Sequence, residues 1–231
     1  MILGILETGA PPGDLARRFP GYADMVRRML GPAFQARAFD VRGGELPSDA
    51  TACDGWLITG SAAGVYDPEP WIGDLMAFLR EVSGTAPMVG ICFGHQVMAQ
   101  AFGGEVVKSP KGWGVGRHTY AVSRVCPWMD SDTPVRLPVS HQDQVVAPPP
   151  DAVVVGGSDF TPFAMLAYPG RRAFSLQAHP EFTADYTRAL IESRRGSRLD
   201  PALADAAVAS LAGDDDHERV AGWIRRFLTS A

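Results

Sequence analysis

The sequence contains few cysteines, and they do not come in pairs. Cys53, Cys92 and Cys126 are scattered through 231 residues. Disulfide frameworks and zinc sites need cysteines at close spacing, or cysteines with histidine partners nearby. We therefore expect no disulfide framework and no metal site, and a cysteine with a function is expected to act as a thiol.

Long apolar runs and basic stretches are also missing. No run approaches the roughly 20 apolar residues that span a bilayer, and the beginning, MILGILETGAPPG, lacks the positive segment and apolar core of a signal peptide. The net charge of −5 is mixed along the chain, without the basic stripe that neutralises a phosphate backbone. We expect a soluble, cytoplasmic protein that binds neither membranes nor nucleic acids.

Repeats, low-complexity tracts and long linkers are absent as well. A length of 231 residues suits one sizeable core. The chain is 46% hydrophobic and 20% charged, which is an ordinary globular balance. We predict a single domain over residues 1–231.

What the sequence does contain is an alternation of strand-like and helix-like segments. The strand-like runs are 2–6, 34–41, 55–59 and 86–91, and the helical patterns are 21–30, 70–82 and 94–102. This alternation predicts an α/β fold, with a mostly parallel central sheet and helices on both of its faces.

The second half of the chain has a different pattern. Short β-type runs separated by Gly and Pro continue to residue 178, and they predict antiparallel strands that extend the sheet. Two helices are expected to close the chain. In the last, residues 216–228, an apolar face is formed by Val220, Ile224, Phe227 and Leu228. We expect that face to pack on the core.

The stretch GICFGHQ, residues 90–96, places a cysteine between glycines where a strand gives way to a helix. Gly90, Cys92 and Gly94 form G-x-C-x-G, the cysteine counterpart of the G-x-S-x-G nucleophile elbow. The helix start stabilises a thiolate, and the N–H of Phe93 is placed to donate to an oxyanion. The motif alone leaves a second interpretation open, a structural cysteine in a tight turn.

A second motif ends another strand-like run and supplies a base. In FSLQAHPEF, residues 174–182, Pro180 favours an extended backbone at His179. Residues i and i+2 of an extended segment share a face, so Glu181 can hold the imidazole. Taken alone, the motif also fits a strand end that turns into a helix near Thr183. Because a cysteine nucleophile needs such a base and orienter, the two motifs together favour catalysis.

These motifs resemble the class I glutamine amidotransferase family, and the likeness runs over most of the chain. It also covers GWLITGSAAGVYD at 55–67 and SHQDQV at 140–145, in the family's order. The resemblance is nearest to stand-alone members that are similar to the GMP synthetase glutaminase domain. It implies a flavodoxin-like fold, with Cys92 as nucleophile, His179 as base and Glu181 as orienter, and neither a metal nor an organic cofactor.

The resemblance also implies the remaining site residues. The oxyanion hole would be formed by the N–H of Phe93 together with that of Gly60 or Ser61. Glutamine-side contacts would fall on Gln96 and on the backbone around Ser140, His141, Gln142 and Asp143. Loops of the GMP synthetase type have the sequence Ser-Gly-Gly-Pro, whereas residues 59–62 are Thr-Gly-Ser-Ala. We therefore expect a different shape for this oxyanion loop.

The implied reaction is hydrolysis of the γ-carboxamide of glutamine, or of a γ-glutamyl amide, through a cysteine thioester. Ammonia would pass to a separate synthetase chain, since the sequence has no P-loop motif and no synthetase domain. Two alternatives stay open: a self-sufficient γ-glutamyl peptide hydrolase with a wider pocket, and a non-catalytic binding or thiol-sensing protein.

Overall fold

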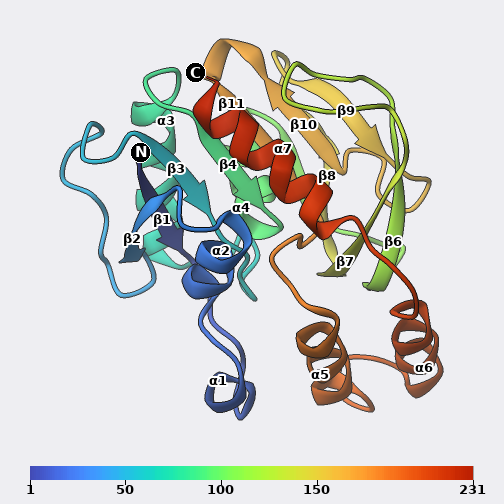
Figure 1. Ribbon diagram of the computed structural model, residues 1–231. Coiled ribbons are helices and arrows are strands. Elements are labelled where there is room, and N and C mark those ends of the chain that lie inside the picture. Colours follow the sequence, from blue (N-terminus) through green and yellow to red (C-terminus); the bar gives the residue numbers. More distant parts are fainter. Residues whose placement is uncertain (231) are drawn as a thin grey trace.

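The computed structural model describes residues 1–230, and a nine-stranded sheet forms its centre (Figure 1). The strand order is β2-β1-β3-β4-β11-β10-β9-β6-β7, and a separate two-stranded ribbon pairs β5 with β8. The strands are β1 (Ile2–Glu7), β2 (Gln35–Asp40), β3 (Gly55–Ile58), β4 (Met88–Ile91), β5 (Glu105–Lys108), β6 (Gly114–Val122), β7 (Val135–His141), β8 (Asp143–Ala147), β9 (Val153–Gly157), β10 (Met165–Tyr168) and β11 (Ala173–Leu176).

The sheet is parallel in its first half and largely antiparallel in its second. Strands β1 to β4 pair in parallel, whereas β10, β9, β6 and β7 continue the sheet through antiparallel pairs. This confirms the predicted fold class. The strand before His179, β11, joins the two halves, because it pairs in parallel with β4 on one side and antiparallel with β10 on the other. The β5–β8 ribbon also lies outside the main sheet.

Helices cover both faces of the sheet and one of its ends (Figure 1). Helices α2 and α7 pack on one face and α3 and α4 on the other, while α1, α5 and α6 lie beyond the end of the sheet (Figure 1). Three helices follow β11 where the sequence predicted two. The helices are α1 (Leu15–Arg18), α2 (Tyr22–Leu30), α3 (Pro70–Val82), α4 (Phe93–Ala101), α5 (Ala184–Arg194), α6 (Pro201–Ser210) and α7 (His217–Thr229), with a 3₁₀ turn at Pro169–Arg171.

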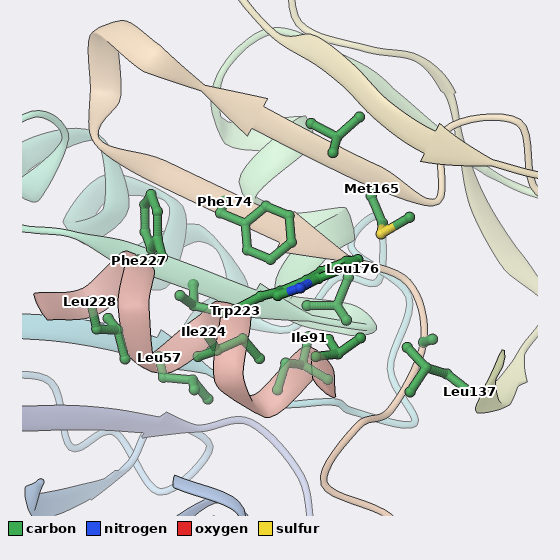
Figure 2. Packing of buried hydrophobic residues seen from close by; sticks show 14 of the residues in the cluster. Leu57, Ile91, Leu137, Met165, Phe174, Leu176, Trp223, Ile224, Phe227 and Leu228 are labelled. Atoms are coloured by element: carbon green, nitrogen blue, oxygen red, sulfur yellow. The ribbon is translucent and has the colours of Figure 1, made fainter. Parts of the chain in front are cut away.

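The apolar face of α7 packs onto the sheet as its sequence pattern predicted (Figure 2). Trp223 is fully buried in this cluster together with Ile224 and Phe174. Its indole Nε1 is satisfied, since it donates to Asp130 Oδ1 at 2.7 Å. The indole therefore buries a large apolar surface without leaving a donor unpaired.

The strand register determines which loops meet. Gly90 of β4 pairs with Ile58 of β3 on one side, and Ile91 pairs with Leu176 of β11 on the other. The carboxyl ends of these three parallel strands therefore lie side by side, which is where ligands bind in open α/β sheets. Within residues 1–230, no helix is both long enough and apolar enough to span a bilayer.

Candidate active site

Cys92 lies at the junction between β4 and α4, with φ 53° and ψ −102°. Among residues 1–230, only Cys92 and Arg172 are non-glycine residues with positive φ. Cysteine is not favoured in this conformation. The surrounding glycines explain how the turn fits: a Cβ on Gly90 would lie 2.5 Å from the carbonyl oxygen of Gly94, and a Cβ on Gly94 would lie 2.4 Å from that of Ile58. The predicted strand–turn–helix is therefore present, and it is tightly packed.

His179 and Glu181 follow β11 and form the second half of the site. His179 Nδ1 lies 2.7 Å from Glu181 Oε1, and both side chains are almost completely buried. The backbone N–H of His179 donates to the carbonyl oxygen of Pro138 at 2.9 Å, which ties this segment to β7. The ring of Phe182 stacks on the imidazole. The histidine is therefore held through its ring edge, its ring face and its backbone.

The imidazole of His179 and the side chain of Cys92 lie beside the same backbone position, since a Cβ on Gly60 would lie 2.9 Å from His179 Cε1 and 3.7 Å from Cys92 Cβ. Burial by itself lowers the pKa of His179, but the charges of Cys92 and Glu181, and the hydrogen bond to Glu181, raise that pKa above its ordinary value. Because Nδ1 is bound to Glu181, Nε2 is the ring atom available to the sulfur. The structure thus brings together the three residues that the two sequence motifs singled out.

The loop after β3 lies beside these residues. Gly60 and Ser61 line the same cavity as Cys92 and His179, and a Cβ on Gly60 would lie 2.9 Å from His179 Cε1. In the part of the chain that the structure describes, the backbone N–H groups of Phe93, Gly60 and Ser61 have no acceptor. Free N–H groups next to a nucleophile are what an oxyanion hole requires.

Only one of the five residues expected to contact glutamine lies on the cavity wall. Ser140 lines the cavity, but Gln96, His141, Gln142 and Asp143 do not. The amide Nε2 of Gln96 donates to the carbonyl oxygen of Asp143 at 2.9 Å and to Gln177 Oε1 at 3.1 Å. Gln96 therefore braces the segment that carries Asp143. Its contact with substrate stays a prediction.

The imidazoles of His141 and His95 lie in buried polar surroundings. His141 Nδ1 lies 3.1 Å from the carbonyl oxygen of Asp143, and burial lowers the pKa of His141 to about 3. His95 Nδ1 lies 2.8 Å from Ser175 Oγ, and burial likewise lowers the pKa of His95 to about 3. Both rings are therefore neutral at physiological pH, and neither lines the cavity.

A cavity of about 970 Å³ opens from Cys92 and His179 and runs along α1 and α5. Tyr22 and Phe182 lie on its wall, and Arg194 does so from the last turn of α5. Sequence reasoning missed Arg194, because it lies far from both motifs and only the docking of α5 brings it to the cavity. Nowhere in residues 1–230 do three or more His, Cys, Asp or Glu side chains cluster in a way that could hold a metal ion.

Several solved structures share this fold. A glutamine amidotransferase from Thermotoga maritima superposes with a TM-score of 0.77 at 18% identity, covering 99% of this chain and 98% of that one. A glutamine amidotransferase from Methylobacillus flagellatus gives a TM-score of 0.75 at 23% identity, covering 99% and 94%. The identities are low, so these likenesses show the fold alone.

Curated proteins match over most of the chain. It is 26% identical over 213 residues to a glutamine amidotransferase-like protein of Schizosaccharomyces pombe, covering 85% of this chain and 86% of that protein. It is 30% identical over 183 residues to gamma-glutamyl peptidase 5 of Arabidopsis thaliana, covering 75% and 72%. A GMP synthase of Thermus thermophilus is 33% identical over 126 residues, covering 54% of this chain but 24% of that protein.

The family model described as glutamine amidotransferase class-I matches residues 36–194, which is more than half of the sequence. The matched region includes Cys92, His179 and Glu181, together with the strands that carry them. The chain therefore belongs to the class I glutamine amidotransferase family.

Proposed function

We propose that this protein hydrolyses a γ-glutamyl amide bond through a covalent thioester on Cys92. The observation that carries the proposal is that Cys92 and His179 line one cavity, while Glu181 holds the imidazole of His179 from behind through Nδ1. A nucleophile in contact with a base that a carboxylate orients is the geometry of covalent acyl transfer.

In the first half of the reaction, the thiol proton of Cys92 passes to His179 and the sulfur attacks the γ-carbonyl carbon of the substrate. The developing oxyanion accepts hydrogen bonds from the N–H groups of Phe93 and of Gly60 or Ser61, which have no other acceptor in the described residues. His179 gives a proton to the leaving nitrogen, the C–N bond breaks, and the amine or ammonia departs. A γ-glutamyl thioester remains on Cys92.

In the second half, water attacks the thioester. His179, now neutral, accepts a proton from that water. The C–S bond breaks and glutamate leaves. Glu181 holds the imidazole through Nδ1 in both halves of the reaction.

Two substrates fit this chemistry, glutamine with transfer of ammonia to a partner synthetase, and a γ-glutamyl peptide. The cavity of about 970 Å³ is at the upper end of the roughly 300–1,000 Å³ range of small-molecule pockets, and glutamine would fill only part of it. Gamma-glutamyl peptidases of Arabidopsis thaliana are also matched over about three quarters of this chain. Both observations favour the peptide substrate.

The test is glutamate release from glutamine and from a panel of γ-glutamyl dipeptides, measured for the wild-type protein and for Cys92→Ser. We expect the wild-type protein to release glutamate, to prefer a dipeptide over glutamine, and to be inactive after the substitution. Preference for glutamine would favour the other alternative, in which glutamine is the substrate and its ammonia passes to a partner synthetase. If no substrate yields glutamate above the level of the variant, the enzyme proposal is wrong. The alternative of a non-catalytic binding or thiol-sensing protein would then be favoured.

A further inference from the structure

The guanidinium of Arg194 lies in the cavity as a fixed and partly desolvated cation. Its Nη1 donates to Ser140 Oγ at 2.5 Å, and its Cζ lies 5.3 Å from the ring centroid of Trp113. Burial lowers the pKa of Arg194, with the charge of Arg198 acting in the same direction. Because a guanidinium is not deprotonated in proteins, Arg194 stays charged.

No carboxylate neutralises this cation. Among residues 1–230, Arg194 forms no ion pair, and neither its Nε nor its Nη2 has a hydrogen-bond acceptor. The contrast is Arg117, which is also buried but pairs with Asp215 at 3.0 Å and donates to the carbonyl oxygens of Ala212, Gly213 and Asp214. A partly buried charge that keeps free donors is expected to meet an anion from outside the chain.

The rest of the cavity lining also carries mostly positive charge. The lining contains three further arginines that form no ion pair within the described chain, Arg18, Arg188 and Arg198. Of the three acidic residues in the lining, Asp14 is paired with Arg17 and Glu192 with Arg195, so only Asp185 is unpaired. The cavity is therefore suited to an anionic occupant.

We propose that Arg194 binds a carboxylate of the substrate through Nε and Nη2, while Nη1 remains on Ser140. This inference rests on the function proposed above. The planar fork of a guanidinium matches a carboxylate with two parallel hydrogen bonds, which a lysine cannot reproduce. A γ-glutamyl peptide offers two such groups, the α-carboxylate of its glutamyl part and the terminal carboxylate of its leaving group.

The experiment compares Arg194→Met and Arg194→Lys with the wild-type protein. Methionine keeps a long side chain against Trp113 and removes the charge, whereas lysine keeps the charge and removes the fork. For a γ-glutamyl dipeptide we expect Arg194→Met to raise KM about 10- to 100-fold, from the strength of charged hydrogen bonds. Arg194→Lys should raise KM by less, and kcat should change less than KM in both. Arg42→Gln, which removes an exposed cation outside the cavity, should leave KM unchanged.

Two modified substrates identify the carboxylate. If Arg194→Met no longer raises KM for a dipeptide with an amidated C-terminus, Arg194 binds the terminal carboxylate of the leaving group. If Arg194→Met no longer raises KM for a dipeptide with an amidated glutamyl α-carboxylate, Arg194 binds the α-carboxylate of the glutamyl part. If Arg194→Met does not raise KM, or raises it equally for all three substrates, the proposal is wrong.

Binding keeps this test separate from the proposed function. Calorimetric titration of the dipeptide into Cys92→Ser, and into Cys92→Ser with Arg194→Met, requires no turnover. If the wild-type protein releases no glutamate but the second substitution still weakens binding about 10-fold or more, the proposed reaction fails and the carboxylate site stands. Equal binding of the dipeptide by both proteins would show that Arg194 does not bind the substrate carboxylate. Thermal unfolding of each variant checks the fold, and Arg194→Lys carries the comparison if Arg194→Met unfolds.

Discussion

The imidazole of His179 lies flat against the ring of Phe182, with the two ring centroids 3.9 Å apart and the planes 6° apart. Phe182 is itself held from other directions by Tyr22 and Tyr186, at centroid distances of 5.6 and 4.6 Å. The stack restricts rotation of the imidazole about an axis that its contact with Glu181 leaves free. Phe182 is thus a positioning residue for the proposed base.

We expect Phe182→Leu to lower kcat while KM changes little. Leucine fills most of the space but has no flat face, so the imidazole samples unproductive orientations. An aromatic pair contributes about 0.5–1.5 kcal/mol beyond its buried area, which corresponds to a fall in kcat of roughly 2- to 10-fold. Steady-state kinetics on a γ-glutamyl dipeptide measure it. Phe39→Leu, a core substitution outside the cavity, controls for general destabilisation, and an equal loss of kcat in both variants would contradict the positioning role.

Glu181→Gln should move the alkaline limb of the activity profile to lower pH. The charge of Glu181 is among the causes that raise the pKa of His179, so an uncharged amide lets the imidazolium lose its proton at a lower pH. A neutral His179 cannot protonate the leaving nitrogen, and activity falls there. The profile of kcat/KM against pH is the measurement, with Asp132→Asn, an exposed acid outside the cavity, as the matched loss of charge. An unshifted alkaline limb would count against the assigned role of Glu181.

Two glycine-to-alanine substitutions should affect different properties, activity for Gly60→Ala and stability for Gly73→Ala. A Cβ on Gly60 would lie 2.9 Å from His179 Cε1, whereas a Cβ on Gly73 in α3 meets no atom within 4 Å. We expect Gly60→Ala to displace the imidazole and lower kcat/KM about 10- to 100-fold. Gly73→Ala should leave activity unchanged and raise the free energy of unfolding by about 0.5–1 kcal/mol, because alanine is the better helix former. Kinetics and urea unfolding of both variants distinguish these outcomes. Full activity in Gly60→Ala would show that the loop has room to move.

The cluster around α7 should dominate stability. Replacing Trp223 by Ala removes the fully buried indole in Figure 2 and is expected to lower the free energy of unfolding by about 3–5 kcal/mol. Trp223→Phe keeps an aromatic ring but removes the donor to Asp130, and should lower it by about 1–3 kcal/mol. Urea denaturation measures both. Equal losses would mean that the hydrogen bond, rather than the buried area, carries the stabilisation.

The site elements that the sequence predicted are local ones. The turn at Cys92 is specified by Gly90 and Gly94 within a few residues, and the contact between His179 and Glu181 follows from an extended backbone over three positions. The alternation of strands and helices likewise comes from short-range periodicity. Each of these could be predicted because the residues that determine it are close in sequence.

What the sequence did not predict depends on distant partners. β11 has the composition of any short apolar strand, and only its pairing with β4 and β10 places it where the parallel and antiparallel halves of the sheet join. Arg194 and Trp113 meet through the docking of α5, and no local pattern distinguishes Arg194 from Arg195 beside it. The four-residue helix α1 carries too few residues for a periodic signal.

The ladder between β4 and β11 also has a kinetic meaning. Cys92 and His179 each lie just beyond this ladder, with Ile91 paired to Leu176, so their separation depends on the register of two strands that are far apart in the chain. Pairings of this kind form slowly, because a long loop must close before the contact is made. During refolding, helices and hairpins can form without this ladder, but the proposed nucleophile and base cannot meet. The return of activity would therefore time the closure of the sheet's centre.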